Sequence, residues 1–145
     1  MITVRDILQV KGNQIWQISP DATVFEALEL MAEKNLGALL VLEGEKIAGI
    51  FSERDYARKI ILKGKASKET SVKEIMTTEV TIVHPGQSVE ECMALMTEKR
   101  VRHLPVLDGE KLVGLISIGD VVKAVISDKE FIIEQLETYI TGGRS

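Results

Sequence analysis

The sequence predicts a mixed α/β (α+β) fold, built from tandem β-α-β-β-α repeats that pack with pseudo-two-fold symmetry. The first observation is a repeat. Residues 18–56 align without a gap on residues 83–121, and 16 of the 39 aligned pairs are identical, which indicates a duplicated unit. The second is that apolar residues in each copy follow helical spacing and then strand spacing. The third is an acidic residue followed by glycine between two apolar runs, at Glu43-Gly44 and Asp108-Gly109, which is typical of a β-hairpin.

Each copy is expected to contain the same elements in the same order. A short strand, Ile15–Ile18 or Val80–Val83, leads to a proline and then to an amphipathic helix that starts near residue 24 or 89. A hairpin follows, and a second helix starts near Ser52 or Ser117. The hairpin strands are expected at Ala38–Leu42 and Lys46–Phe51 in the first copy, and at Leu104–Leu107 and Lys111–Ile116 in the second.

The repeat divides the chain into a first motif at residues 1–65, a second at 66–126, and a C-terminal helix with its tail at 127–145. One motif alone buries too little apolar surface to be stable, so the two are expected to pack together. The last helix, at residues 127–141, is ended by Gly142-Gly143. It can pack on the first helix or contact a second copy of the chain, and both roles stay open.

A Ser/Thr-x-x-Asp/Glu signature recurs at six places, three in each copy. Each one predicts a capping box, in which a hydroxyl and a carboxylate satisfy free N–H groups at a helix start. The pairs are Thr3/Asp6, Thr23/Glu26, Ser52/Asp55, Ser71/Glu74, Ser88/Glu91 and Ser117/Asp120.

Composition and motifs argue against several function classes. A net charge of −4 does not favour a nucleic-acid binder, although residues 99–103 form a short basic run. The single cysteine, Cys92, lies on an apolar helix face and can form neither an internal disulfide nor a multi-thiolate metal site. With no secretory signal or long apolar segment in the sequence, a cytoplasmic setting is expected. No catalytic nucleophile–base arrangement is indicated, so the chain is not expected to be an enzyme.

The repeat, the segment Arg102-His103-Leu104-Pro105-Val106 and the Ser-x-x-Asp signatures together resemble a pair of cystathionine β-synthase (CBS) domains. The resemblance covers about residues 2–126. It implies a stand-alone regulatory module that binds adenosine nucleotides in clefts between the two motifs, modulates a partner protein and forms dimers. A homodimer is also favoured by apolar residues expected on exposed helical faces, namely Ile60, Ile61, Val125 and Ile126.

Two carboxylates are the candidate ribose ligands. Asp55 and Asp120 each follow a strand, in the first turn of a helix whose N-terminus favours a phosphate. One carboxylate can accept hydrogen bonds from both hydroxyls of a ribose, and Ser52 and Ser117 can add a hydroxyl. Capping of the helix is the alternative role, and the two roles are compatible.

The two copies differ where the rest of a nucleotide would lie. The resemblance implies that Gly37 and Ala38 in one copy, and Arg102 and His103 in the other, face the ligand cleft. Arg102, His103 and Arg54 are the candidate phosphate ligands, with a solvated surface charge as the alternative for the arginines. Gly37 and Ala38 leave room for a ring or sugar. Ile18 and Val83 are candidates for contact with adenine, or plain core residues.

AMP is the ligand expected first, with ADP, ATP, NAD or an S-adenosyl compound as further candidates. No catalytic cofactor and no metal are expected. The main alternative function is a ligand-free dimerisation or scaffold module. A nucleic-acid-binding protein is a third and less favoured alternative.

Overall fold

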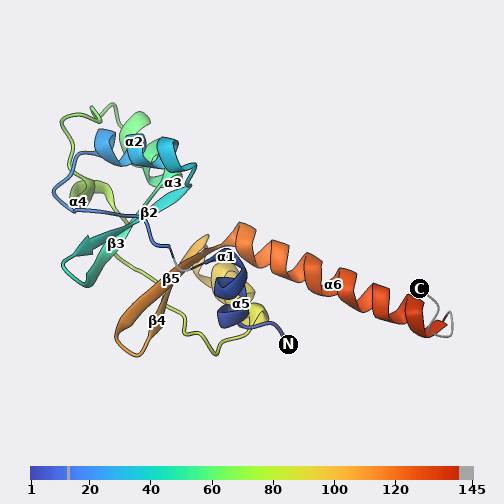
Figure 1. Ribbon diagram of the computed structural model, residues 1–145. Helices are drawn as coiled ribbons and strands as arrows, with labels where there is room; N and C mark the ends of the chain where they lie inside the picture. Colours follow the sequence, from blue (N-terminus) through green and yellow to red (C-terminus); the bar gives the residue numbers. More distant parts are fainter. Residues whose placement is uncertain (13, 141–145) are drawn as a thin grey trace. The chain divides into compact units, whose positions relative to one another are not determined.

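A computed structural model of the chain describes residues 1–12 and 14–140, which divide into two compact units (Figure 1). The central unit is the continuous segment Gln14–Val80. The terminal unit combines Met1–Asn13 with Thr81–Ser145, of which residues 13 and 141–145 lie outside the described part. Helices and small sheets occur in both units, so the predicted mixed α+β class is confirmed.

The central unit holds a three-stranded sheet in the order β1-β2-β3, with β1 parallel to β2 and β2 antiparallel to β3. Its elements are β1 (Gln17–Ile18), α2 (Val24–Lys34), β2 (Ala38–Glu43), β3 (Lys46–Ser52), α3 (Glu53–Asp55), a π-helical segment (Tyr56–Ile61) and α4 (Val72–Ile75). Side chains from α2, β2, β3 and α4 form one apolar core, with Leu39 and Phe51 fully buried at its centre.

The terminal unit repeats this plan with a two-stranded sheet, β4-β5. Its elements are α1 (Val4–Lys11), α5 (Val89–Lys99), β4 (His103–Asp108), β5 (Lys111–Ser117) and α6 (Ile118–Ile140). Both predicted hairpins are present, and Gly44 and Gly109 turn them with a positive φ of 64° that favours glycine. Cys92 is fully buried in the core of this unit, and burial, with a smaller effect of Glu91, raises the pKa of its thiol to about 11.

The strand predicted at Val80–Val83 is wrong except at its last residue. Val83 makes a single parallel bridge with Val106 on β4. In the central unit, the N–H of Leu40 donates to the carbonyl of Trp16 at 3.4 Å and so extends the pairing of β1. The residue equivalent to Leu40 is Pro105, which has no N–H. The ladder therefore cannot extend to the residues before Val83.

The two copies of the sequence repeat exchange one short helix each. α1, which opens the chain, packs in the terminal unit, whereas α4, which opens the second copy, packs in the central unit. Matching backbone hydrogen bonds hold each exchange. Val4 N–H donates to the Gln87 carbonyl (2.9 Å), and its counterpart Val72 N–H donates to the Ala22 carbonyl (2.8 Å). Sequence repeat and compact unit are therefore different divisions of the same chain.

These exchanges bring helix starts together in pairs. Thr3 bridges Ser88, and Thr23 bridges Ser71, as isolated antiparallel pairs. Thr3, Thr23, Ser52 and Ser71 form the predicted capping boxes with the acidic residue three positions later. Ser117 and Asp120 exchange the same two hydrogen bonds, whereas Ser88 accepts the Glu91 N–H through its hydroxyl but its own N–H does not donate to the Glu91 carboxylate.

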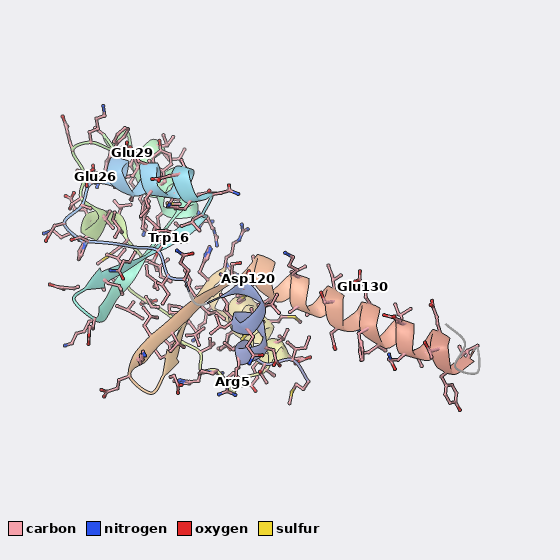
Figure 2. All side chains as sticks on the ribbon, in the orientation of Figure 1. Arg5, Trp16, Glu26, Glu29, Asp120 and Glu130 are labelled. Atoms are coloured by element: carbon pink, nitrogen blue, oxygen red, sulfur yellow. The ribbon has the colours of Figure 1, made fainter. Side chains whose placement is uncertain are left out.

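The C-terminal helix is not a separate element, because α6 runs unbroken from Ile118 to Ile140. Residues 120–140 contain no glycine or proline, so no helix-breaking residue separates the first turns of α6 from the rest of the helix. Every residue from Ile126 to Ile140 is exposed, Glu130 among them (Figure 2), so packing of residues 127–140 on the first helix is ruled out. Residue 141 and Gly142-Gly143 lie outside the described residues.

The proposed dimer patch also needs a correction. Ile60 is 1% exposed and belongs to the core of the central unit, and Val125 is half-buried against the core of the terminal unit. Ile61 and Ile126 remain exposed, at 58% and 52%. Within the described part of the chain, no helix combines the length and apolar character needed to span a membrane.

Each exchanged segment packs closely against one glycine of the hairpin in its unit. A Cβ at Gly49 would lie 2.6 Å from the backbone carbonyl oxygen of Thr77, just after α4. A Cβ at the equivalent Gly114 would lie 2.6 Å from a terminal methyl of Leu8 on α1. The neighbour of Gly49 is therefore fixed backbone, and that of Gly114 is the end of a flexible side chain.

We predict that Gly49→Ala destabilises the protein more than Gly114→Ala. Gly49→Ala requires a shift of the backbone, so we expect the free energy of unfolding to fall by about 3 kcal/mol. Gly114→Ala requires only a rotamer change of Leu8, so we expect a fall of about 1 kcal/mol. Urea unfolding of both variants measures the difference. Gly86→Ala is the control, because its Cβ would meet nothing within 4 Å. Equal losses at positions 49 and 114 would contradict this account of the packing.

Candidate functional site

In each unit the predicted residues meet where the second hairpin strand ends and a helix starts. Ala38 pairs with Ser52 at the end of β2-β3, and His103 pairs with Ser117 at the end of β4-β5. In each unit, the residue just before Ala38 or His103 accepts a hydrogen bond from the N–H of the first residue of the helix. Glu53 N–H donates to the Gly37 carbonyl (3.1 Å), and Ile118 N–H donates to the Arg102 carbonyl (2.8 Å). Strand, loop and helix start thus form one compact corner in each unit.

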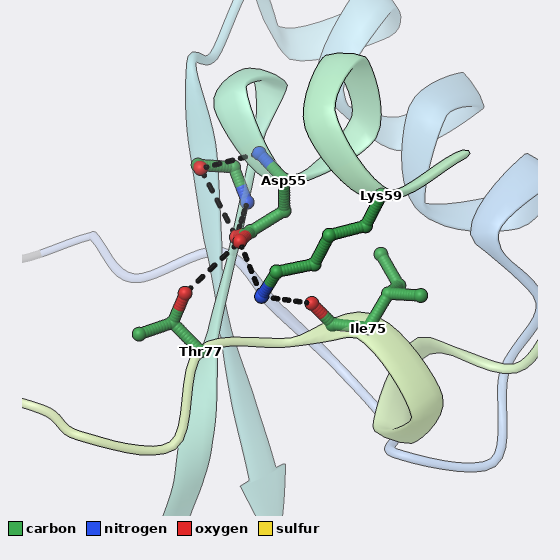
Figure 3. A network of polar contacts seen from close by, with 5 residues as sticks. Asp55, Lys59, Ile75 and Thr77 are labelled. Carbon is green, nitrogen blue, oxygen red and sulfur yellow. Dashed lines mark hydrogen bonds and ion pairs between the residues drawn. The ribbon is translucent and has the colours of Figure 1, made fainter. Parts of the chain in front are cut away.

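In the central unit, Asp55 is 6% exposed and both of its carboxylate oxygens have partners (Figure 3). Oδ2 accepts the backbone N–H and the hydroxyl of Ser52 at 3.0 and 3.1 Å. Oδ1 accepts the Thr77 hydroxyl at 2.9 Å and forms an ion pair with Lys59 Nζ at 3.0 Å. Lys59 also donates to the Ile75 carbonyl at 2.9 Å, so this network joins the helix start to α4 and the residues after it.

In the terminal unit, Asp120 is less enclosed, with its side chain 23% exposed. Its Oδ2 accepts the backbone N–H of Ser117 at 2.8 Å and pairs with Lys11 Nζ at 2.6 Å. Lys11 also donates to the Leu115 carbonyl at 2.6 Å. Burial raises the pKa of the Asp120 carboxyl, but hydrogen bonds from Lys11 and Ser117 outweigh it and hold that pKa below its ordinary value.

The partners of the two carboxylates were missed by sequence reasoning. Lys59 lies four residues after Asp55, a spacing that predicts an ion pair on a helix. Lys11 and Thr77 gave no such signal, because they lie 109 and 22 residues from the acid that they contact. Both come from the exchanged segments, Lys11 from α1 and Thr77 from the residues just after α4. The exchange is thus what supplies each acid with a partner.

The candidate phosphate residues divide between the units. Arg102 and His103 lie at the start of β4 in the terminal unit, Arg102 exposed and His103 half-buried. Burial and the charges of Lys11 and Arg102 lower the pKa of the His103 imidazole, and Asp120 only partly opposes them. Arg54 lies half-buried on α3 of the central unit.

The candidate adenine residues lie farther along the sheets. Ile18 pairs with Val41 and Val83 with Val106, each three residues along the strand from Ala38 or His103. At 3.3 Å per residue this is about 10 Å, the scale of a nucleoside. Val83 is fully buried, Ala38 is buried, Ile18 is half-buried and Gly37 is exposed.

A groove of about 410 Å³ adjoins the Lys11–Asp120 pair in the terminal unit. It is lined by Ile2, which precedes α1, and by side chains of α1 and α6, namely Asp6, Ile7, Val10, Lys11, Asp120, Lys123, Ala124 and Ser127. Its walls are mainly apolar, with two lysines and two carboxylates. Among the residues that the structure describes, no group of His, Cys, Asp and Glu side chains could hold a metal ion.

Comparison with known proteins gives consistent matches. The family model described as "CBS domain" matches residues 4–62 and 72–127. The chain is 41% identical over 151 residues to the CBS domain-containing protein CBSX3, mitochondrial, of Arabidopsis thaliana, covering 97% of this chain and 73% of that protein. Among solved structures, a protein with CBS domains from Burkholderia ambifaria has 58% identity and a TM-score of 0.84, covering 87% of this chain and 95% of that one. CBSX2, solved in complex with AMP, has 27% identity and a TM-score of 0.70, covering 89% and 99%.

We predict that Lys11→Met destabilises the protein in a pH-dependent way. Asp120 has a lowered pKa in the folded state, so its pairing stabilises the fold above the ordinary value of 3.8 and is lost as the pH falls through the folded pKa. For this partly exposed pair we expect a loss of about 1 kcal/mol at pH 7. The difference from wild type should shrink below pH 3.8. Unfolding by urea across this pH range measures it.

Lys63→Met serves as the control, because Lys63 is exposed and its removal should cost little at any pH. A loss for Lys11→Met that stays constant from pH 7 to pH 3 would show that the ion pair is not its cause.

Proposed function

The chain belongs to the CBS domain family, and on that premise we propose that it is a regulatory module, not an enzyme, that binds an adenine nucleotide. The observation that carries the proposal is the corner at the start of α6. There a partly exposed carboxylate, a hydroxyl, an arginine and a histidine gather at the end of one hairpin. CBSX2 was solved in complex with AMP, which supports AMP as the first ligand to test.

We assign the ribose to Asp120 and Ser117. Within the described residues, the hydrogen bonds to the Asp120 carboxylate all reach Oδ2, so a ribose hydroxyl can donate to Oδ1. The Asp55 carboxylate is buried, and both of its oxygens are engaged by Ser52, Thr77 and Lys59. We therefore propose that Asp55 and Ser52 hold the central unit together, and that Asp120 binds ligand.

The phosphate is assigned to Arg102 and His103, with Arg54 as a further candidate. Arg102 is charged at every working pH and presents a planar set of donors that suits a phosphate. The lowered pKa of His103 leaves its imidazole neutral at pH 7, so it contributes one N–H donor but no charge. Contact of adenine with Ile18, Val83, Gly37 or Ala38 stays a prediction, as does the choice among AMP, ADP, ATP, NAD and S-adenosyl compounds.

The second candidate function is a scaffold module that works without ligand, and the exposed apolar residues of α6 favour it. The two functions predict different effects of added nucleotide on the melting temperature of the protein. A ligand that binds only the native state must raise that temperature, whereas a scaffold that binds no ligand shows no change. A screen of adenine compounds by thermal shift separates them. No observation favours a nucleic-acid-binding role.

We also propose that the protein is a homodimer that regulates a partner protein in the cytoplasm. The location stays a prediction from the sequence, and the CBSX3 relative carries the description mitochondrial.

We predict that Arg102→Ala weakens binding of AMP far more than binding of adenosine. Only AMP carries the phosphate, and loss of one charged contact should cost about 1.5–3 kcal/mol, or roughly ten- to a hundred-fold in affinity. Calorimetric titration of both ligands against wild type and variant measures this. Equal losses for the two ligands would refute the phosphate assignment. No binding of any adenine compound to wild type would refute nucleotide binding itself.

We predict opposite effects for the two equivalent carboxylates. Asp120→Asn should weaken AMP binding about tenfold, because the amide replaces a charged acceptor, with a small loss of stability. Asp55→Asn should leave AMP binding within about twofold but lower stability, because the ion pair with the 38%-exposed Lys59 is lost. Calorimetry and urea unfolding on both variants test the assignment, and weaker AMP binding in Asp55→Asn would contradict it.

A further inference from the structure

Most of α6 extends beyond the core of the terminal unit as an exposed helix (Figure 1). Exposed side chains recur along it at alternating intervals of four and three residues, the spacing that pairs two helices. We call this set the α6 stripe, and its members are Val122, Ile126, Lys129, Ile133, Leu136 and Ile140. The five apolar members are between 50% and 79% exposed.

The spacing of the α6 stripe reads the same in both directions about position 131. Two antiparallel copies of α6 centred there would place Val122 against Ile140 and Ile126 against Leu136 of the other copy. Lys129 would then lie against Ile133, not against a second Lys129. A parallel pair would instead bring the two Lys129 ammonium groups together, which is unfavourable in an apolar contact.

The charges beside the stripe also favour the antiparallel arrangement. Lys123 and Glu137 each follow a stripe residue by one position, on the same side of the helix. Antiparallel pairing about position 131 places Lys123 of each copy near Glu137 of the other, and the two-fold axis makes two such ion pairs. In a parallel pair the two-fold axis runs along the helices and places equivalent flanking residues on opposite sides of the contact, so Lys123 and Glu137 of the two copies would not meet. Glu130 meets its own copy at the axis, with Lys129 next to it to compensate.

The terminal unit offers a seat for the end of the partner helix. A shallow open hollow of about 580 Å³ lies along the first turns of α6, lined by Ser117, Ile118, Gly119, Asp120, Val122, Lys123 and Ile126. The antiparallel arrangement brings Leu136 and Ile140 of a second copy against Val122 and Ile126, which line this hollow together with the proposed ribose ligands Ser117 and Asp120. Apolar side chains thereby lose contact with water at both ends of the helix pair.

We infer that α6 is the contact between two copies of this chain, which pair antiparallel through the α6 stripe. This inference rests on the proposed homodimer and not on nucleotide binding. The homodimer and the α6 contact can fail separately. A dimer whose dissociation constant does not change when α6 is mutated refutes only the contact, whereas a monomeric protein refutes both.

The first test compares two exposed residues on opposite sides of α6. Ile133 belongs to the stripe and Phe131 lies on the other side, and they are 55% and 59% exposed. Because neither is buried, both variants should fold. Sedimentation equilibrium should give a dimer for wild type and for Phe131→Gln, and Ile133→Gln should raise the dissociation constant of the dimer about tenfold or more. Equal effects of the two variants, or a monomeric wild type at micromolar concentration, overturn the inference.

The second test exchanges the proposed ion pair. Lys123→Glu alone and Glu137→Lys alone each create two like-charge contacts, and each should weaken dimerisation about tenfold at low salt. The double variant Lys123→Glu/Glu137→Lys restores opposite charges and should regain the wild-type dissociation constant within about threefold. A double variant as weak as the sum of the two single variants overturns the antiparallel arrangement.

The third test reads the direction of the helices by cross-linking, in a Cys92→Ala background. Mixed Ile126→Cys and Leu136→Cys proteins should form a disulfide-linked heterodimer, whereas each alone should form little. Lys129→Cys alone should cross-link strongly only if the helices are parallel. A strong Lys129→Cys dimer without the mixed heterodimer therefore overturns the proposal.

Discussion

Two helix starts from different repeats lie side by side in each unit, and the rest of the structure depends on this pairing. Thr3 meets Ser88 in one unit, and Thr23 meets Ser71 in the other, with reciprocal backbone hydrogen bonds around both pairs. N–H groups at helix starts have no partner within the helix and must find one elsewhere. Here the neighbouring segment of the same chain accepts hydrogen bonds from some of these N–H groups. The pairing also decides which apolar residues share a core, since it brings α1 and α4 to the sheets that they cover.

The same exchange shapes the candidate site. Asp55 and Asp120 occupy equivalent positions after equivalent strands, yet the segment that crosses over gives them different partners. After α4 comes a threonine that helps to enclose Asp55, whereas α1 ends in a lysine that reaches Asp120 and leaves it partly exposed. Of the two duplicated corners, one has both carboxylate oxygens engaged, and in the other the hydrogen bonds that the described residues make to the carboxylate all reach Oδ2. This difference is the basis for proposing ligand binding at Asp120 and not at Asp55.

Local patterns predicted most of the fold. Both hairpins, α2, α5 and the six helix starts follow from turn residues, apolar spacing and capping signatures, which act over a few neighbours in sequence. The predictions that failed concern longer range or a missing group. Pro105 stands on one strand and prevents pairing of another, and α6 continues past Ser127 because nothing interrupts it. Ile60 was predicted to be exposed on the assumption of regular α-helical spacing. Residues 56–61 are π-helical instead, which changes the side of the helix on which Ile60 lies, and Ile60 is buried.

In the candidate site, the carboxylates and their capping hydroxyls were predictable, and so was Lys59 in principle. Lys11 and Thr77 were not, because only the exchange of helices brings them to the acids.

The exchange of α1 has a further consequence during synthesis. The central unit is one continuous segment and can fold once residue 80 has left the ribosome, but α1 must wait for a partner that begins at residue 81. The contacts of α1 lie about 80 to 110 residues later in the chain, from Val4 with Gln87 to Lys11 with Asp120, which at typical elongation rates is a delay of roughly 4–22 s. During this interval Val4, Ile7 and Leu8, later buried, face solvent or a chaperone.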